Sequence, residues 1–276
     1  MTQSPYFATL TSRAVIAVEG PDWRTFLQGL LTQDVEGQAV GTVRYGALLT
    51  PQGRLLYDLF ILAGEAGCLL DVAADHRDAL IQRLTLYRLR AKVTISASPL
   101  TVTALWETDL AEGFLTDPRL GALGLRGYGA ALPGGAIEVT EADYQAHRLA
   151  LGVPDPANDA PADTTYPIEA NFDLLNGIDF KKGCFVGQET TSRMKRRGTI
   201  KTRIVPIQFN GPPPAFGTEI LNGDLRAGEV LSGQDGRAMA SLRLDRLDGA
   251  LSVQGQPVSV DWPDWMERPA LGESGT

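Results

Sequence analysis

The sequence is poor in cysteine and histidine, and this scarcity excludes several kinds of site. Its 276 residues contain two cysteines and two histidines. Cys68 stands in the apolar run CLLDV, whereas Cys184 follows two lysines and a glycine. Such different settings indicate two reduced thiols rather than a disulfide. His76 and His147 are far apart and show no metal-ligand spacing, so we expect no zinc site and assign no metal ligand.

Long apolar runs and an excess of basic residues are also missing. No run approaches the roughly 20 apolar residues of a membrane helix, and the start, MTQSPYFATLTSRAVIAVEG, has neither the pattern of a secretory signal nor that of a transit peptide. The formal net charge of -8 argues against nucleic acid or an anionic membrane as the main partner. We therefore expect a cytoplasmic protein that binds neither membrane nor nucleic acid.

The first part of the chain alternates between strand and helix patterns. Residues 14–18 read as a strand, and residues 45–50 and 55–62 form a hairpin around the turn sequence PQGR. A helix is predicted over 74–87, where apolar residues recur at helical spacing. Several strands followed by a helix in so short a span indicate an α+β unit with its helices on one face of a sheet.

The pattern of apolar and turn-forming residues changes after residue 204. Short apolar stretches are cut by NGPPP, NGD, SGQDG and QGQ at close intervals. This pattern is typical of a small antiparallel β-barrel or sandwich.

The most informative segment is KGCFVGQE, which begins at Lys182. Gly183 and Gly187 permit unusual backbone angles on either side of Cys184, and a helix is predicted from near Gly187 to a C-cap at Gly198. A thiol just before a helix N-terminus and next to lysines is favoured as a thiolate relative to a free thiol of pKa about 8.5. The residues alone also allow Cys184 to be a small buried side chain that lets the loop pack tightly.

This segment agrees throughout with the pattern K-G-C-Y/F-x-G-Q-E. Four further stretches, FLQGLLTQDV, GRLLYDLFIL, DPRLGALG and GEVLSGQDGRAMASLRLD, follow the same order along the chain. On these motifs the sequence resembles the YgfZ-type folate-binding proteins, the iron-sulfur maturation branch of the glycine-cleavage T-protein (aminomethyltransferase) superfamily.

The resemblance implies an α+β, T-protein-like fold in three parts around a central cavity that binds tetrahydrofolate, with a C-terminal antiparallel β-barrel. It implies a role in the assembly or repair of iron-sulfur proteins, and hence folate and iron-sulfur proteins or their assembly factors as partners. The domains expected on this basis are a discontinuous folate-binding domain (1–44 plus 106–200), a ferredoxin-like α+β domain (45–105), the barrel (201–266) and a disordered tail (267–276).

The resemblance also assigns site residues. It places Lys182 and Cys184 at the reactive part of the signature, followed by the run Gly187, Gln188 and Glu189.

Two carboxylates complete the expected folate site. Glu169 stands where relatives hold the pterin ring, and a carboxylate can accept two N–H groups from the 2-amino pyrimidine edge; an alternative is that it stabilises a helix N-terminus. Asn171 is its weaker neighbour. Asp58 interrupts an apolar strand and is matched to the acidic residue that lies near folate N5 and N10; an outward-facing strand position is the alternative. The T-protein pattern has a second Asp just before, where this chain has Tyr57.

Other interpretations remain open at this level. The chain could be a folate-dependent one-carbon transferase or demethylase using Asp58, or a non-catalytic scaffold in which Cys184 is structural. A basic stretch after the signature is either a solvated helix end or a docking site for an anion such as a folate polyglutamate tail or an acidic protein. Its residues are Arg193, Lys195, Arg196, Arg197, Lys201 and Arg203.

Overall fold

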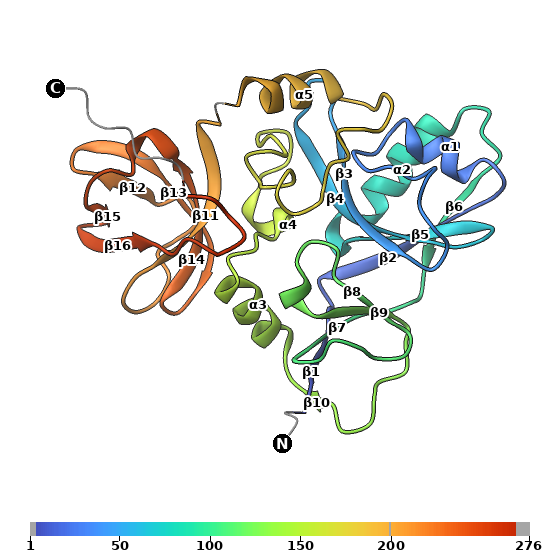
Figure 1. Ribbon diagram of the computed structural model, residues 1–276, viewed down its shortest axis with the longest axis horizontal. Coiled ribbons are helices and arrows are strands. Elements are labelled where there is room, and N and C mark those ends of the chain that lie inside the picture. Colours follow the sequence, from blue (N-terminus) through green and yellow to red (C-terminus); the bar gives the residue numbers. More distant parts are fainter. Residues whose placement is uncertain (1–3, 199, 269–276) are drawn as a thin grey trace.

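The computed structural model describes residues 4–198 and 200–268 of the chain. It contains two five-stranded sheets and a closed β-barrel, with helices between and around them. Figure 1 shows the barrel at one end of the molecule and the two sheets with their helices at the other. Of the predicted tail, residues 269–276 lie outside the described residues.

The larger sheet carries two helices on one face, as the sequence predicts. Its order is β3-β4-β5-β2-β6, with bounds β2 (Arg13–Glu19), β3 (Val43–Leu49), β4 (Leu55–Ala63), β5 (Gly67–Ala73) and β6 (Thr94–Ser98). The helices are α1 (Trp23–Gln28) and α2 (Arg77–Arg88), and the short 3-10 turn η1 (Ala74–His76) precedes α2. Side chains alternate along β4: Leu59 and Ile61 pack in the core that contains Leu80 and Leu84 of α2, and Phe60 packs in a separate core. Asp58 lies on the same side of the strand as Phe60 and so faces away from the helices.

The second sheet has the order β10-β1-β7-β9-β8. Its strands are β1 (Tyr6–Thr9), β7 (Val102–Trp106), β8 (Phe114–Thr116), β9 (Leu125–Tyr128) and β10 (Ile137–Glu138), with η2 (Gly121–Leu123) before β9. Helix α3 (Glu141–Ala150) follows, and Thr140 and Asp143 form the reciprocal capping box that their spacing predicts. The next segment, 154–164, contains α4 (Pro156–Asp159), whose buried Asp159 accepts hydrogen bonds from Arg148 and Ser232.

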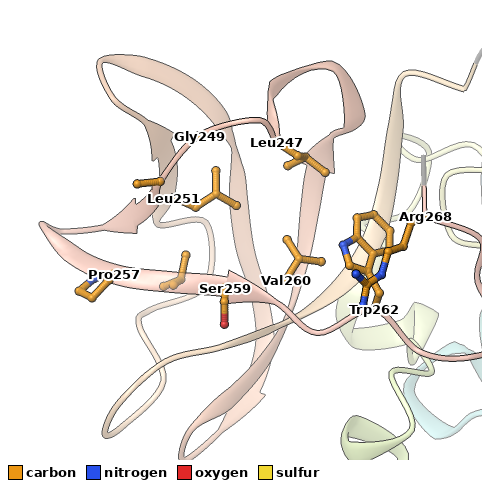
Figure 2. A pocket seen from close by; sticks show the side chains of 10 residues that line it. Leu247, Gly249, Leu251, Pro257, Ser259, Val260, Trp262 and Arg268 are labelled. Carbon is orange, nitrogen blue, oxygen red and sulfur yellow. The ribbon is translucent and has the colours of Figure 1, made fainter. Parts of the chain in front are cut away.

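The C-terminal barrel confirms the prediction from the turn pattern. Its closed order is β11-β14-β13-β12-β15-β16, with bounds β11 (Thr202–Gln208), β12 (Glu219–Asn222), β13 (Leu225–Gln234), β14 (Arg237–Arg243), η3 (Leu244–Arg246), β15 (Leu251–Val253) and β16 (Gln256–Val260). Apolar side chains from all six strands fill its interior. A pocket of about 450 Å³ lies at the barrel. Figure 2 shows Leu251, Val260, Trp262 and Arg268 in its wall.

Strand pairing does not follow the predicted boundaries at 44/45 and 105/106. The first falls inside β3, and β2 lies between β5 and β6 in the larger sheet. The second follows most of β7, which pairs with β1 and β9. Residues 13–98 therefore build one sheet, while 6–9 and 102–138 build the other. This grouping depends on pairings between distant segments, which local patterns do not reveal.

Candidate functional site

The signature segment forms a loop that leads into α5 (Gln188–Arg197). The helix begins after Gly187 and ends at Gly198, which has φ 68°, in agreement with the sequence. Before it, Asp179 Oδ1 accepts the backbone N–H groups of Lys181 and Lys182 at 2.7 and 3.2 Å, which fixes the turn that presents the cysteine.

Cys184 is exposed to solvent at the tip of this loop. The next side chain, Phe185, is 8% exposed and belongs to the core that also contains Ile168, Phe172 and Ile178. Val186 N–H bonds the carbonyl of Gly29 at 3.1 Å. The loop is thus held on both sides of a thiol that points outward, so the geometry favours the accessible thiol over the small buried side chain.

Lys182 anchors the loop. Its Nζ donates to the carbonyl oxygens of Gln28, Leu31 and Gln33, each at 2.7 Å. Burial lowers the pKa of Lys182 to about 8, and Asp34 and Asp179 act in the opposite direction. All three ammonium donors are used within the protein, so Lys182 holds the loop that carries Cys184 in place.

Gly187 permits a close contact between α5 and the β3–β4 turn. Its φ is 81°, and a Cβ there would lie 2.6 Å from Thr50 O and 2.9 Å from the Cα of Gly53. Gly53 has φ 82°, and a Cβ there would lie 2.9 Å from Gly187 O. An L side chain at either position would be strained and would clash with backbone. Of the two other residues in the predicted run, Gln188 is half-buried and Glu189 is exposed in the first turn.

Asp58 is buried, so the alternative of an outward-facing strand position is wrong. The carboxylate is 3% exposed and accepts from Arg13 Nη1 at 3.2 Å. Burial raises the pKa of Asp58, while Arg13 acts to lower it. Arg13 also bonds Asp71 Oδ1 through Nε at 2.7 Å, so Asp58 belongs to a larger buried network.

The rest of this network was not predicted. Arg126 bonds Asp71 Oδ2 at 2.6 Å and Asp117 at 3.4 Å, and Arg119 bonds Asp117 at 2.8 Å. Burial alone would raise the pKa of Asp71, but Arg126 and Arg13 hold it below its usual value. The available signals were Asp71 inside the apolar run CLLDV, and Asp117 and Arg119 in DPRLGALG.

A small cavity lies beside these charges. It measures about 20 Å³ and its wall includes Arg13, Arg119, Arg126, Arg148 and Asp155. Arg126 Nε is buried there without a hydrogen-bond partner. Such a space holds about one water molecule, and the bicyclic pterin of a folate is far larger. A second pocket of about 170 Å³ shares Ser12, Arg13 and Asp155 with this cavity, so the space beside the charged network extends beyond the smaller volume.

Glu169 and Asn171 lie nearer the barrel. Glu169 Oε2 accepts the N–H of Tyr166 at 2.9 Å, and burial raises the pKa of its half-buried carboxyl. Asn171 is fully buried; its amide donates to Ile204 O at 2.6 Å and its carbonyl accepts from Arg203 at 3.0 Å. Asn171 thus uses both side-chain groups to join this segment to β11. No helix begins at Glu169, since α4 ends at Asp159 and α5 starts at Gln188, so its bond to Tyr166 closes a local turn and does not stabilise a helix N-terminus.

A larger pocket adjoins the signature loop. Its volume of about 440 Å³ falls in the usual range for small-molecule sites. Arg44, Tyr45, Phe180 and Lys181 contribute two cations and two aromatic rings to its wall. Arg44 also bonds Asp34 at 3.1 Å.

The described residues contain no group of three or more His, Cys, Asp or Glu side chains that could hold a metal ion. The second thiol, Cys68, is buried in the core of the larger sheet, and burial raises its pKa to about 12. Within 4–198 and 200–268, no helix has both the length and the apolar character to span a membrane.

Comparison with known proteins gives relatives along nearly the whole chain. The human mitochondrial iron-sulfur cluster assembly factor IBA57 is 31% identical over 93% of this chain and 84% of its own length. The mouse protein of the same name is 32% identical over the same shares. This chain belongs to the IBA57 family of iron-sulfur cluster assembly factors.

Two further comparisons agree with the fold. Residues 201–268 match the family described as the CAF17 C-terminal beta-barrel domain. The crystal structure of glycine cleavage system aminomethyltransferase T from Bartonella henselae superposes with a TM-score of 0.77 over 98% of this chain and 89% of that one, at 19% identity. The predicted α+β, T-protein-like fold with a C-terminal barrel is therefore confirmed.

Membership of the IBA57 family also corrects one prediction. The human, mouse, Mycosarcoma maydis and Neurospora crassa relatives are all named as mitochondrial proteins. The expectation of a cytoplasmic protein, drawn from the composition and from the character of the first residues, is contradicted by these names.

Proposed function

We propose that this chain is an accessory protein for the assembly or repair of iron-sulfur proteins, and that Cys184 is the group that meets the cluster or its client. The observation that carries the proposal is the outward-facing thiol on a fixed loop. Lys182 holds one side of that loop through three carbonyls, and Gly187 fits the other side against the β3–β4 turn.

The chemistry of clusters sets the kind of partner. A cluster usually takes four thiolate ligands, whereas this chain has one exposed cysteine and one buried one. Cys184 can therefore contribute one ligand at most, and the partner must supply the others. The partner in this proposal is an iron-sulfur protein or an assembly factor that carries cysteines of its own.

Complementation tests the proposal. Cells that lack the endogenous relative are supplied with wild type, Cys184→Ser or Cys68→Ala, and the activity of iron-sulfur enzymes is measured in extracts. We expect Cys184→Ser to lose the rescue and Cys68→Ala to retain it at equal protein level. Rescue by Cys184→Ser equal to that of wild type would reject the role of the thiol and favour a scaffold with a structural cysteine.

We also propose, as the resemblance to YgfZ-type proteins implies, that tetrahydrofolate binds this chain. Support comes from the T-protein-like fold and from the 440 Å³ pocket beside the signature loop. Arg44 and Lys181 would face the carboxylates of the ligand there, and Tyr45 and Phe180 would contact its rings. Asp58 is buried against Arg13 and lines neither this pocket nor the cavity beside Arg13, so the geometry does not favour one-carbon transfer at Asp58.

Calorimetry with tetrahydrofolate separates the two candidate locations. Weaker binding by Arg44→Ala and Lys181→Ala would support the pocket, whereas loss of binding in Glu169→Ala alone would support the position implied by the resemblance. No heat of binding to wild type would reject folate as a ligand and would leave the proposal for Cys184 intact, because the thiol lies outside this test.

A further inference from the structure

The end of α2 exposes an apolar and basic surface that the signature site does not use. Leu86 lies in the last turn of α2 and is 77% exposed, and Leu89, the residue that follows the helix, is 88% exposed. Arg88, Arg90 and Lys92 are exposed around them. We call these five residues the α2 patch.

Leu89 also sits in an unfavourable backbone conformation. Its φ and ψ are 43° and -102°, and the N–H of Ala91 donates to Arg88 O at 2.7 Å to close the turn. Leu89 therefore occupies the first central position of a turn close to type II′, where glycine is preferred. An apolar side chain in water on a strained backbone brings no benefit to folding, and such departures from local rules mark functional positions.

Helix α1 connects the α2 patch to the loop that carries Cys184. Lys92 N–H bonds Asp22 Oδ2 at 2.7 Å, next to the first residue of α1. At the other end of α1, Gln28 O accepts from Lys182 Nζ. The six residues of α1 span about 9 Å at 1.5 Å per residue. A partner bound at the patch would thus be within reach of the signature loop, at the end of the molecule away from the barrel (Figure 1).

We propose that the α2 patch docks an acidic amphipathic segment of the protein partner that meets Cys184. The two leucines offer apolar contacts three residues apart, and the three cations offer partners for carboxylates around them. The patch is locally basic in a chain of net charge -8. At physiological salt, screening limits the attraction between exposed charges to about 8 Å. The three cations of the patch therefore attract carboxylates that lie directly against it. An anionic membrane would face the acidic remainder of the chain as well, so a protein segment fits better.

A synthetic peptide tests the docking directly. The probe is a labelled helix of about 18 residues, five turns long, with leucines on one face and glutamates on the other. Its control has the same composition with the leucines scattered. Fluorescence anisotropy should show tighter binding of the amphipathic peptide to wild type, and binding that weakens as salt is raised.

Substitutions then locate the contact. The double variant Leu86→Ser, Leu89→Ser should weaken binding by about tenfold or more, because two apolar contacts are lost. Arg88→Glu with Arg90→Glu should weaken it comparably. Leu110→Ser and Leu225→Ser are matched controls, because these leucines are 85% and 62% exposed elsewhere, and they should bind like wild type.

Several results would overturn the docking proposal. They are equal binding of both peptides, equal binding by wild type and the double leucine variant, binding of anionic vesicles in place of the peptide, and self-association of wild type that the double variant abolishes.

The identity of the partner rests on the proposed function, and complementation keeps the two ideas separable. If Cys184→Ser loses rescue while the leucine variant binds peptide like wild type, the docking is wrong and the proposed function stands. If the leucine variant loses the peptide while Cys184→Ser still rescues, the docking stands and the role of the thiol is wrong.

Discussion

Replacing Lys182 with methionine should loosen the loop that presents Cys184. The change keeps the length and most of the apolar stem of the side chain but removes the ammonium group. The carbonyls of Gln28, Leu31 and Gln33 then lose a donor that lies 2.7 Å from each. Lys181→Met is the matched control, because the adjacent Lys181 is exposed.

The size of the effect follows from two opposing contributions. A hydrogen bond to a charged group stabilises by about 1.5–3 kcal/mol, so three of them would give about 4.5–9 kcal/mol. Against this stands the cost of burying the charge, which lowers the pKa of Lys182 to about 8. Lys182 is only half-buried, so water can hydrogen-bond some of the carbonyl oxygens that lose the ammonium group. We therefore expect Lys182→Met to cost about 2–4 kcal/mol of unfolding free energy.

Urea unfolding at neutral pH measures this cost, and the alkylation rate of Cys184 follows the state of the loop. Lys182→Met should lower the urea midpoint and change the alkylation rate, whereas Lys181→Met should leave the urea midpoint within error. An unfolding free energy of Lys182→Met within about 0.5 kcal/mol of wild type would refute the view that these three bonds hold the loop.

Three further changes test other parts of the structure. Gly187→Ala should destabilise by about 2 kcal/mol or more, because it adds strain at positive φ and a clash with backbone; Gly198→Ala, also at positive φ but with open space around its Cβ, should cost less in the same thermal assay, and equal costs would contradict the packing argument. Leu89→Gly should raise the unfolding free energy by about 0.5–1 kcal/mol by relieving backbone strain, and a loss of stability would contradict the strain. Asp71→Asn should cost about 3–5 kcal/mol at neutral pH, since two buried arginines lose a partner. The pKa of Asp71 is lowered in the folded state. The stability difference between wild type and Asp71→Asn should therefore shrink as pH falls below the usual value of about 3.9 and through the folded pKa. A stability difference that stays constant in acid would contradict the stabilising role of the Asp71 carboxylate.

The local elements could be predicted because their signals are local. Thr140 and Asp143 are three residues apart, which is the spacing of a capping box, and Gly198 follows a helical run. The barrel was recognisable from closely spaced turns, and the whole-chain fold from motifs shared with a known superfamily.

The site depended on contacts that no local pattern contains. Lys182 finds its three carbonyls about 150 residues earlier in the chain, and Asp58 meets Arg13 across the sheet. The loop around Cys184 is held because Phe185 is buried in a core and Val186 bonds Gly29. The sequence could therefore name Lys182, Cys184 and Asp58, whereas only the packing of the sheets shows which of them is anchored, exposed or buried.

The most direct test of the central claim uses the difference between the two thiols. Cys184 is exposed, while Cys68 is buried with its pKa raised to about 12, so brief treatment with iodoacetamide should modify the folded wild-type chain once, at Cys184, as peptide mass spectrometry can verify. The singly alkylated protein is then compared with untreated protein for its ability to restore iron-sulfur enzyme activity in an extract depleted of the endogenous relative. We predict that alkylation abolishes the restored activity; full activity of protein alkylated at Cys184 would contradict the claim that this thiol meets the cluster or its client.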